Sequence, residues 1–425
     1  MLQLNFIREN QQTVVDGLKK RNFTEEKLAV LTQVLSLDDQ RRQIQTTLDG
    51  SLAERNKLSK EVGELFKKGA HQEADVIKDK VNQLKDSISE LESQLKDTMD
   101  RLDSLLLTIP NIPHESVPAG SSEQDNEVAQ AWDKALPVLE QQALPHWELA
   151  SKYQIFDLEL GTKLTGSGFP VFRGKGARLE RSLISFFLDE ATKAGYEEIM
   201  PPLMVNEATA RGTGQLPDKE AQMYHVTKDD LYLIPTAEVP VTNIFRDVIL
   251  DVEQLPVKMT AYTPCFRREA GSYGAHVRGL NRVHQFDKVE IVQFQHPDKS
   301  YETLQEMVAH VEGLLNKLEL PFRILRLCGG DMGFTSALTF DFEVYSAAQQ
   351  RWLEVSSVSN FETFQSNRMK IRYREGKKIQ LLHTLNGSAL ALARIVAAIL
   401  ENNQTPEGIV IPSVLRPYTG FDIIA

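Results

Sequence analysis

Two short stretches, Phe266-Arg267-Arg268-Glu269 and Phe286-Asp287-Lys288-Val289-Glu290, decide the predicted fold of the larger part of this chain. The second stretch alternates apolar and polar residues, which is typical of a strand with one buried face. The interval between them is polar and contains Gly271, Ser272, Gly274 and Gly279. Glycine-rich polar intervals favour turns. We therefore expect two antiparallel strands joined by a long turn.

The residues of this hairpin suit a nucleotide. A guanidinium group matches phosphate oxygens, an aromatic ring can stack on a base, and a carboxylate can accept from an amine or a hydroxyl. Arg267, Phe286, Glu269 and Glu290 supply these groups. A hairpin with ordinary surface charges would fit the same pattern, so other segments must decide between the two interpretations.

Two further segments have patterns that predict secondary structure. Upstream, Arg178 to Lys193 carries a helical apolar stripe, and a short strand after it stops at Pro201-Pro202. Downstream, the small residues from Asn386 onward predict the start of a helix that carries Arg394. This helix continues through four apolar residues that indicate a core-facing side, namely Ile395, Val396, Ile399 and Leu400.

In this order the three elements resemble motifs 1, 2 and 3 of the class II aminoacyl-tRNA synthetases. The resemblance narrows to the seryl-tRNA synthetase family and runs essentially from end to end of the chain. Five stretches carry it: Gly212-Thr213-Gly214-Gln215-Leu216-Pro217, Ile234-Pro235-Thr236-Ala237-Glu238, Gly330-Asp331-Met332-Gly333-Phe334, Glu354-Val355-Ser356-Ser357 and Asn386-Gly387-Ser388. The resemblance implies an α+β protein with a mainly antiparallel catalytic sheet flanked by helices. It also implies a ligase that joins serine to tRNA.

Length and composition limit the class of protein to which this chain can belong. A chain of 425 residues exceeds one ordinary core, and we place two domains at 1–108 and 109–425. The absence of a long apolar run or signal peptide predicts no membrane partner. Only Cys265 and Cys328 occur, without metal-ligand spacing, which fits the reducing cytoplasm. A net charge of −11 argues against indiscriminate nucleic-acid binding and against DNA as a partner.

The first domain is expected to be a helical hairpin. From Thr24 the sequence lacks proline up to Pro110, and its second half has a heptad seam from Ile77 to Leu105, in which Thr98 or Met99 fills the one gap. A break at Lys67–Gln72 contains Gly69, a natural helix C-cap. Two helices of about 40 residues would each span about 60 Å and pack antiparallel as a projecting coiled-coil arm.

The tip half of the first arm helix is basic. Five cations gather there against only two carboxylates: Arg55, Lys57, Lys60, Lys67 and Lys68. A solvated coiled-coil face would also carry charges. A basic tip beside a nucleotide-handling domain favours phosphate contact, and the resemblance implies that this arm grips the backbone of serine tRNA.

The resemblance also implies the ATP site. Arg267 matches the arginine that binds the α-phosphate and Arg394 the one that binds the γ-phosphate, so these two are the candidate catalytic residues. Phe286 is expected to stack on adenine and Glu269 to lie near its amino group, whereas the role of Arg268 is open. Glu354 and Ser357 match the ligands of an ATP-bound Mg²⁺. The full predicted ATP-binding set is Arg267, Arg268, Glu269, Phe286, Glu354, Val355, Ser356, Ser357 and Arg394.

The serine site is implied in the same way. Its predicted residues are Thr236, Ala237, Glu238, Arg267, Glu290, Asn386 and Ser388. Carboxylates there can hold the α-ammonium and accept from the side-chain hydroxyl, and the sequence leaves open which does which. Two positions depart from the family pattern, because Ala389 and Ala393 stand where glycine is frequent.

The motif 1 segment implies a homodimer, and the family often charges selenocysteine tRNA as well. Two alternative functions are also considered. A paralogue could activate an amino acid for a carrier other than tRNA, but it would not need a long basic arm. A coiled-coil scaffold with an inactive domain is the second alternative, and the retained Arg267, Phe286, Glu354 and Arg394 argue against it.

Overall fold

The computed structural model describes residues 1–139, 143–218, 221–269 and 278–425. The chain divides into two compact units. The smaller comprises Leu2–Lys19 and Phe23–Pro110, and the larger comprises Met1, Lys20–Asn22 and Asn111–Ala425. Among the described helices, none combines the length and the apolar character that crossing a bilayer requires.

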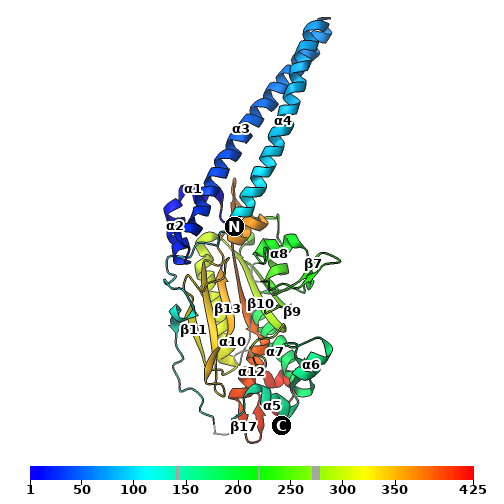
Figure 1. Cartoon of the computed structure of the whole chain (residues 1–425). Coiled ribbons are helices and arrows are strands. Elements are labelled where there is room, and N and C mark those ends of the chain that lie inside the picture. Colours follow the sequence, from blue (N-terminus) through cyan, green and yellow to red (C-terminus); the bar gives the residue numbers. More distant parts are fainter. Residues whose placement is uncertain (140–142, 219–220, 270–277) are drawn as a thin grey trace. The chain divides into compact units, whose positions relative to one another are not determined.

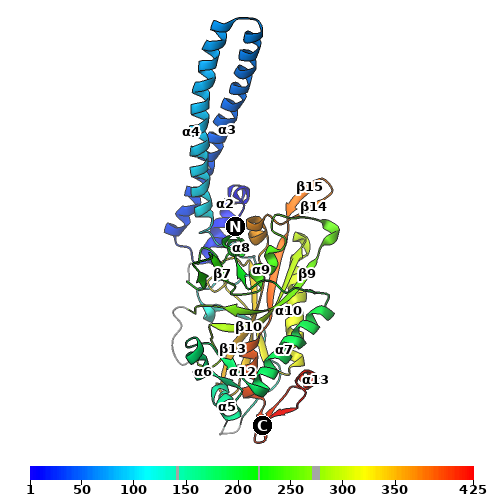
Figure 2. The ribbon, with the colours of Figure 1, turned by 90° about the vertical axis from the view of Figure 1, so that its right-hand side faces the viewer.

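The smaller unit is helical, as predicted. Two short helices, α1 (Leu4–Glu9) and α2 (Gln11–Lys20), precede α3 (Glu25–Lys67) and α4 (His71–Leu106). Helices α3 and α4 lie side by side as a long hairpin (Figures 1 and 2). Thr24 caps the start of α3 by accepting from the Lys27 amide. Gly69, with φ of +75°, adopts the left-handed conformation expected of a C-cap glycine.

The seam between α3 and α4 follows the heptad pattern. In α4 the buried side chains recur at Ala74, Val81, Ile88 and Leu102, which is a seven-residue repeat. The gap in the predicted seam is filled by Thr98, which is 6% exposed, and not by Met99, which is 46% exposed. The threonine hydroxyl is satisfied within its own helix, because it donates to the Gln94 carbonyl at 2.7 Å.

The larger unit is built on an eight-stranded sheet of order β1-β11-β12-β13-β16-β10-β9-β4. Its strands are β1 (Glu127–Gln130), β4 (Glu197–Glu198), β9 (Val257–Phe266), β10 (Gln285–Gln295), β11 (Phe322–Arg326), β12 (Leu338–Ser346), β13 (Arg351–Asn360) and β16 (His383–Ala391). All neighbours pair antiparallel except β4 and β9. This confirms the predicted α+β class with a mainly antiparallel sheet.

Three helices pack on the sheet and share its principal core: α7 (Gly174–Lys193), α10 (Ser300–Lys317) and α12 (Leu392–Asn402). The stripe predicted on the first of them is buried, since Leu179, Leu183 and Phe187 are 0% exposed. A second cluster around Val292, Phe294 and Met369 includes residues of α9 (Glu238–Asn243) and α11 (Phe364–Met369).

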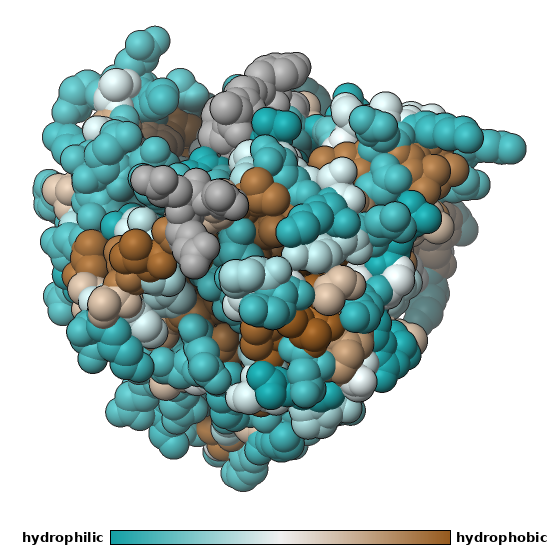
Figure 3. Space-filling model, turned by 90° about the horizontal axis from the view of Figure 1, so that it is seen from below, coloured by the Kyte–Doolittle hydropathy of each residue, from teal (hydrophilic) through white to brown (hydrophobic). Residues whose placement is uncertain are grey.

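The remaining elements form smaller substructures around the sheet. Short sheets are made by β2 (Phe156–Asp157) with β3 (Val171–Phe172); β5 (Met204–Val205), β6 (His225–Val226) and β7 (Leu231–Leu233); β8 (Ile249–Asp251), β14 (Arg372–Glu375) and β15 (Lys378–Leu381); and β17 (Gln404–Thr405), β18 (Gly408–Val410) and β19 (Ile423–Ile424). The other helices are α5 (His146–Tyr153), α6 (Leu158–Leu164), α8 (Glu207–Thr213) and α13 (Arg416–Thr419). The end of this unit that carries α5 and the C-terminus presents apolar patches among hydrophilic side chains (Figure 3).

One prediction of local structure is wrong. The stretch Asn386–Ala391 is not the start of a helix but the last six of the nine residues of β16, and α12 begins only at Leu392. The strand is held on both sides, by β13 and β10. Asn386 and Gly387 pair with both neighbours, and Ser388 and Ala391 pair with β10, so sheet pairing overrides the helical preference of this stretch.

Candidate active site

The predicted hairpin is present as β9 and β10, which pair antiparallel from Phe266 with Gln285 to Val257 with Phe294. Strand β9 ends at Phe266, so Arg267, Arg268 and Glu269 follow directly after it. Of the predicted turn residues, Gly271, Ser272 and Gly274 lie outside the described residues. Gly279 is described and has φ of +70°, a conformation that favours glycine.

A cavity of about 200 Å³ lies where β10, β13 and β16 meet the start of α12. Alternate residues of a strand share one face, and Phe286 and Lys288 of β10 both line the cavity. Eight predicted site residues line it together: Arg267, Glu269, Phe286, Glu354, Val355, Ser356, Ser388 and Arg394. The two arginines are 127 positions apart in sequence, yet the fold brings both to one cavity beside an aromatic ring.

Arg267 is held in place without being neutralised. Its guanidinium carbon lies 5.2 Å from the centre of the Phe286 ring, and its Nε donates to the Pro235 carbonyl at 3.3 Å. Within the described parts of the chain, no carboxylate forms an ion pair with Arg267. This cation is therefore available to an anionic ligand.

Arg394 stands at the first turn of α12 and is fixed by two backbone carbonyls. Its Nε donates to the Asn281 carbonyl at 3.0 Å, and its Nη1 donates to the Glu354 carbonyl at 2.6 Å. The carboxylate of Glu354 lies 3.7 Å from the same Nη1. These contacts orient the guanidinium and leave 29% of the side chain exposed.

Of the two residues after Arg267, only Glu269 lines the cavity. Glu269 has φ of +48° and forms an ion pair with Arg282, and both line the cavity. Arg268 does not line it. The guanidinium carbon of Arg268 lies 6.0 Å from the centre of the Tyr224 ring, and its amide donates to the Gln222 carbonyl.

Behind the cavity lies a buried polar cluster that contains predicted serine-site residues. Glu290 is 2% exposed and Thr236 4% exposed, and the Thr236 hydroxyl donates to Glu290 Oε2 at 3.0 Å. Lys288 joins the cluster to the cavity, because its Nζ donates to Thr236 Oγ1 at 2.9 Å and pairs with Glu290. Ala237 is fully buried directly before α9, and its side chain packs in the hydrophobic cluster around Val292 and Phe294.

Glu238 is the second carboxylate of this cluster. Burial, together with the nearby charge of Glu290, raises its pKa to about 7, although Gln365, Lys288 and Asn386 act in the opposite direction. Gln365 donates to Glu238 Oε1 at 2.6 Å. Burial disfavours the ionised form of this carboxyl group, and a cationic ligand beside it would offset that penalty and favour ionisation.

Oxygen groups on β12 and β13 fit a hard cation. Glu354 is half exposed at the cavity, whereas Ser357 lies outside its lining and opposite Asp341 in register. Ser357 hydrogen-bonds to the Asp341 carboxyl, whose Oδ1 is buried without a hydrogen-bond partner. Burial, and then the charge of Glu354, raises the pKa of Asp341 well above its usual range. Carboxylate and hydroxyl oxygens are what Mg²⁺ prefers, so this donor set fits that ion. Among the described residues, no three His, Cys, Asp or Glu side chains cluster as a preformed metal cage.

Four residues at the cavity and the buried polar cluster were not predicted as site residues: Asn281, Arg282, Lys288 and Gln365. Lys288 could have been found, because it alternates with Phe286 and Glu290 on one strand face. The other three carry no local signal, since they reach the site from a loop and from α11.

The predicted tRNA-contacting residues lie on the hairpin arm. Lys57, Lys60, Lys67 and Lys68 are exposed, and Arg55 is half-buried. At about 100° per residue, the four lysines fall within roughly a third of the helix circumference, and Arg55 points nearly the opposite way, towards the seam. In the described part of the chain none of the five forms an ion pair.

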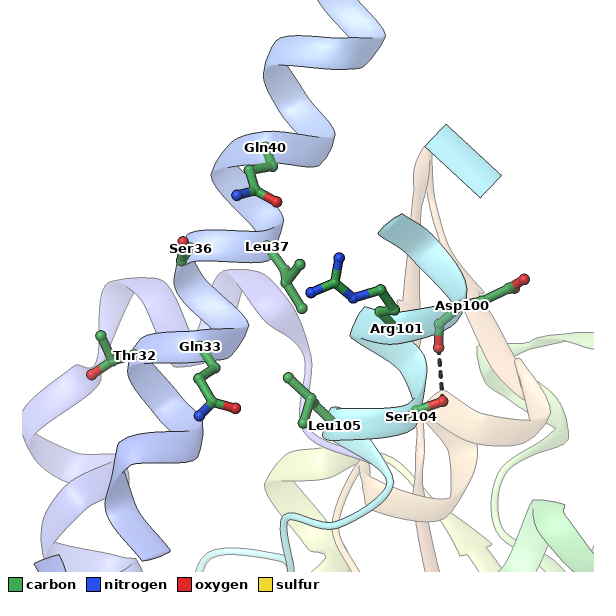
Figure 4. A pocket seen from close by; sticks show the side chains of 9 residues that line it. All are labelled: Thr32, Gln33, Ser36, Leu37, Gln40, Asp100, Arg101, Ser104 and Leu105. Carbon is green, nitrogen blue, oxygen red and sulfur yellow. Dashed lines mark hydrogen bonds between the residues drawn. The ribbon is translucent and has the colours of Figure 1, made fainter. Parts of the chain in front are cut away.

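A larger cavity, of about 770 Å³, lies between α3 and α4 at the opposite end of the arm (Figure 4). Arg101 extends from α4 towards α3, and Gln33 and Gln40 line the facing side. Its lining contains one arginine and no aromatic ring. This cavity lacks the paired cations and the aromatic plane that mark the smaller one.

Comparisons with known proteins agree with this geometry. Residues 1–113 match the model of the seryl-tRNA synthetase N-terminal domain, and residues 223–403 match that of the class II tRNA synthetase core domain (G, H, P, S and T). The chain is 51% identical to a serine–tRNA ligase of Salinibacter ruber over 99% of its own length and 98% of that protein's. It is 50% identical to that of Caldicellulosiruptor saccharolyticus over the full length of both.

Solved structures give the same result. The crystal structure of seryl-tRNA synthetase from Pyrococcus horikoshii complexed with ATP superposes with a TM-score of 0.92 at 35% identity, covering 100% of this chain and 99% of that one. The cytoplasmic enzyme from Naegleria fowleri in complex with AMP superposes with a TM-score of 0.86 at 26% identity, covering 100% and 98%.

Proposed function

This chain belongs to the seryl-tRNA synthetase family, and we propose that it is a serine–tRNA ligase with the site residues described above. It activates L-serine with ATP to seryl-adenylate and transfers the seryl group to the 3′-terminal adenosine of tRNA. The observation that carries the assignment is one cavity that gathers Arg267, Arg394 and Phe286 beside a buried cluster of polar groups. Full-length similarity to serine–tRNA ligases favours this function over activation for another carrier.

In the first step a serine carboxylate oxygen attacks the α-phosphorus of ATP. The new bond is the carboxyl–phosphate anhydride, and the bond to pyrophosphate breaks and leaves its electrons there. Both reactants are anions, so the protein needs mainly positive charge and positioning. We assign Arg267 to the α-phosphate and the serine carboxylate, and Arg394 to the γ-phosphate. Phe286 stacks on adenine, and the Arg267 guanidinium already lies 5.2 Å from that ring.

The serine site is assigned to the cluster behind Lys288. Glu238 and Glu290 receive the α-ammonium and the side-chain hydroxyl, with Thr236 and Ser388 as further hydrogen-bonding groups. A site built around a hydroxyl leaves its polar groups unpaired when alanine enters, which costs a factor of roughly 10⁴. Lys288 compensates the Glu290 charge before serine binds.

Mg²⁺ is assigned to Glu354 and Ser357. The Asp341 carboxyl group forms a hydrogen bond with the hydroxyl group of Ser357. When bound there, Mg²⁺ would supply charge neutralisation between the phosphates. Asp341 orients Ser357, and the Arg394 hydrogen bond to the Glu354 carbonyl holds β13 against α12.

The arm is assigned to tRNA through its exposed lysines. Sequence-independent contact with phosphates suits double-stranded RNA, whose deep major groove hides the bases. We infer that Lys57, Lys60, Lys67 and Lys68 make these contacts and that Arg55 belongs to the seam. Selenocysteine tRNA as a second substrate stays a prediction.

A homodimer formed through the motif 1 region is supported by exposed apolar side chains next to β4. Met200 is 91% exposed, Leu203 37% and Met204 48%. Neighbouring exposed apolar residues of this size are typical of an interaction surface.

Pyrophosphate exchange with a panel of amino acids tests the function. Exchange should depend on ATP, Mg²⁺ and serine, and alanine and threonine should support it at least about 10³-fold less well. Exchange that depends on a different amino acid would refute the substrate assignment.

A further inference from the structure

The segment Arg278–Arg282, which leads into β10, is fixed by contacts with parts of the chain that are distant in sequence. The guanidinium carbon of Arg278 lies 4.8 Å from the centre of the Trp147 ring. Gly279 packs so closely on His146 that a Cβ there would lie 2.1 Å from the ring Nε2. Arg282 pairs with Glu269 at the cavity. The chain therefore enters the candidate ATP site in one defined conformation.

His146 at the start of α5 makes the central contact. Its Nε2 accepts a hydrogen bond from the Leu280 amide at 2.8 Å, so the ring proton must reside on Nδ1. That Nδ1 lies 2.6 Å from Glu401 Oε1 and donates to it. Both side chains are 0% exposed. A carboxylate that fixes the tautomer of a histidine also fixes the direction in which its other nitrogen accepts.

Glu401, in α12, is the hub of this arrangement. It also accepts from the His146 amide at 2.9 Å, from Gln349 Nε2 at 2.9 Å and from the Ser346 hydroxyl. Burial by itself would raise the pKa of Glu401, but the hydrogen bonds from His146 and Ser346 lower it below the usual value. A buried carboxylate that only accepts hydrogen bonds is thereby held ionised.

A second branch runs from the hub to the same segment. Gln349 Oε1 accepts from the Asn281 side chain at 3.0 Å, and the Asn281 carbonyl accepts from Arg394 Nε at 3.0 Å. Glu401 therefore reaches the Leu280 amide through His146, and Asn281 through Gln349. Asn281 in turn presents its carbonyl to the arginine that we assign to the γ-phosphate.

We propose that His146, Glu401 and Gln349 form a positioning clamp that fixes Leu280 and Asn281 and so sets the orientation of Arg394 and Arg282 towards ATP. None of the three residues lines the cavity, so they act through the residues they hold. The assignment rests on the proposed function, because it takes the ligand at this cavity to be ATP. It predicts that loss of the clamp weakens ATP use and spares serine, whose cluster lies mainly on β10, at the start of α9 and in the two residues before α9.

The test compares His146→Phe with wild type in serine-dependent pyrophosphate exchange. Phenylalanine keeps the ring volume but leaves the buried Leu280 amide without an acceptor, which should raise the KM for ATP about 10-fold. The KM for serine should change by less than about 2-fold. His146→Gln keeps one donor and one acceptor and should restore most of the loss. Hydrogen exchange of the peptide containing Leu280 should be faster in His146→Phe and close to wild type in His146→Gln.

His383 provides a matched control, since it is a half-buried histidine of the same unit that bonds Ser300 at 2.7 Å and does not line the cavity. His383→Phe should lower stability without separating the two KM values. Equal changes of both KM values in His146→Phe, or no rescue by His146→Gln, would overturn the clamp. Should His146→Phe fail to fold, Gln349→Leu removes only the second branch and should raise the ATP KM roughly 3-fold; an unchanged value would count against the proposal.

Different measurements test the clamp and the proposed function, so one can be refuted without the other. Calorimetric titration of ATP without serine measures the clamp directly, and the His146→Phe variant should bind ATP about 10-fold more weakly. Absence of serine-dependent exchange in the wild-type chain would refute the function and leave this binding difference intact.

Discussion

Replacing Glu238 by glutamine should stabilise the free protein at alkaline pH while it disables the serine site. Folding raises the pKa of this carboxyl from 4.5 to about 7, because burial and the charge of Glu290 outweigh the opposing contacts with Gln365, Lys288 and Asn386. Glutamine is almost the same size and can still accept from Gln365. It carries no charge that the fold must bury.

The magnitude and its pH window follow from linkage. The native state binds this proton more tightly than the unfolded state, so the contribution of Glu238 to the stability of the wild type is greatest below pH 4.5. It falls as the pH rises from 4.5 to about 7, and the full cost applies above that range. A difference of about 2.5 pKa units corresponds to about 3 kcal/mol. Since the side chain is only partly shielded from solvent, we expect about 2 kcal/mol.

Thermal unfolding of the free protein at pH 5 and pH 8 measures this. Glu238→Gln should raise the Tm at pH 8 by roughly 3 °C relative to wild type, and by much less at pH 5. The exposed Glu253 offers a control, and Glu253→Gln should leave the Tm unchanged at both values. Serine-dependent exchange should fall by about 10²-fold in Glu238→Gln, because a hydrogen bond between a charged carboxylate and the bound serine is removed. A Tm gap that is negative at pH 8, or equal at both pH values, would refute the reasoning.

Three other outcomes are expected. Arg394→Ala should raise the KM for ATP about 10²-fold and that for serine only slightly in exchange assays, whereas an unchanged ATP dependence would make the residue structural. Replacing the four exposed arm lysines by neutral residues should make the plot of the logarithm of the tRNA binding constant against the logarithm of the salt concentration less steep. The slope should fall by about 0.7 to 0.9 for each phosphate that a lysine no longer neutralises. Arg55→Gln should leave the slope unchanged if Arg55 belongs to the seam. Deleting residues 35–98 should spare serine-dependent exchange and abolish tRNA charging, and undiminished charging would remove the arm from the mechanism.

The sequence predicts those features that local periodicity determines. The heptad spacing of Val81, Ile88 and Leu102 was sufficient for the hairpin arm, because a seam of this kind requires only one partner helix. Alternation around Phe286 and Glu290 was likewise sufficient for β10. The resemblance supplied Arg267 and Arg394, and the fold brings both to one cavity.

Features set by tertiary contacts escaped prediction. Asn386–Ala391 has the small residues of a helix start, but its neighbours β10 and β13 impose a strand. His146 and Glu401 are 255 positions apart, and nothing near either residue indicates the other. Gln365 and Asn281 reach the site only because helices and loops far along the chain pack beside it.

The seven-residue repeat of the arm makes its length adjustable in fixed increments. Adding or removing one heptad in α3 together with one in α4 would change the distance from base to tip by about 10 Å, while each buried side chain would meet an equivalent partner and the lysines would keep their side of the helix. A single added turn of four residues would instead turn them by about 40° around the helix axis and shift the seam out of register. The length of such an arm can therefore change in whole steps without any change in the packing of its interior.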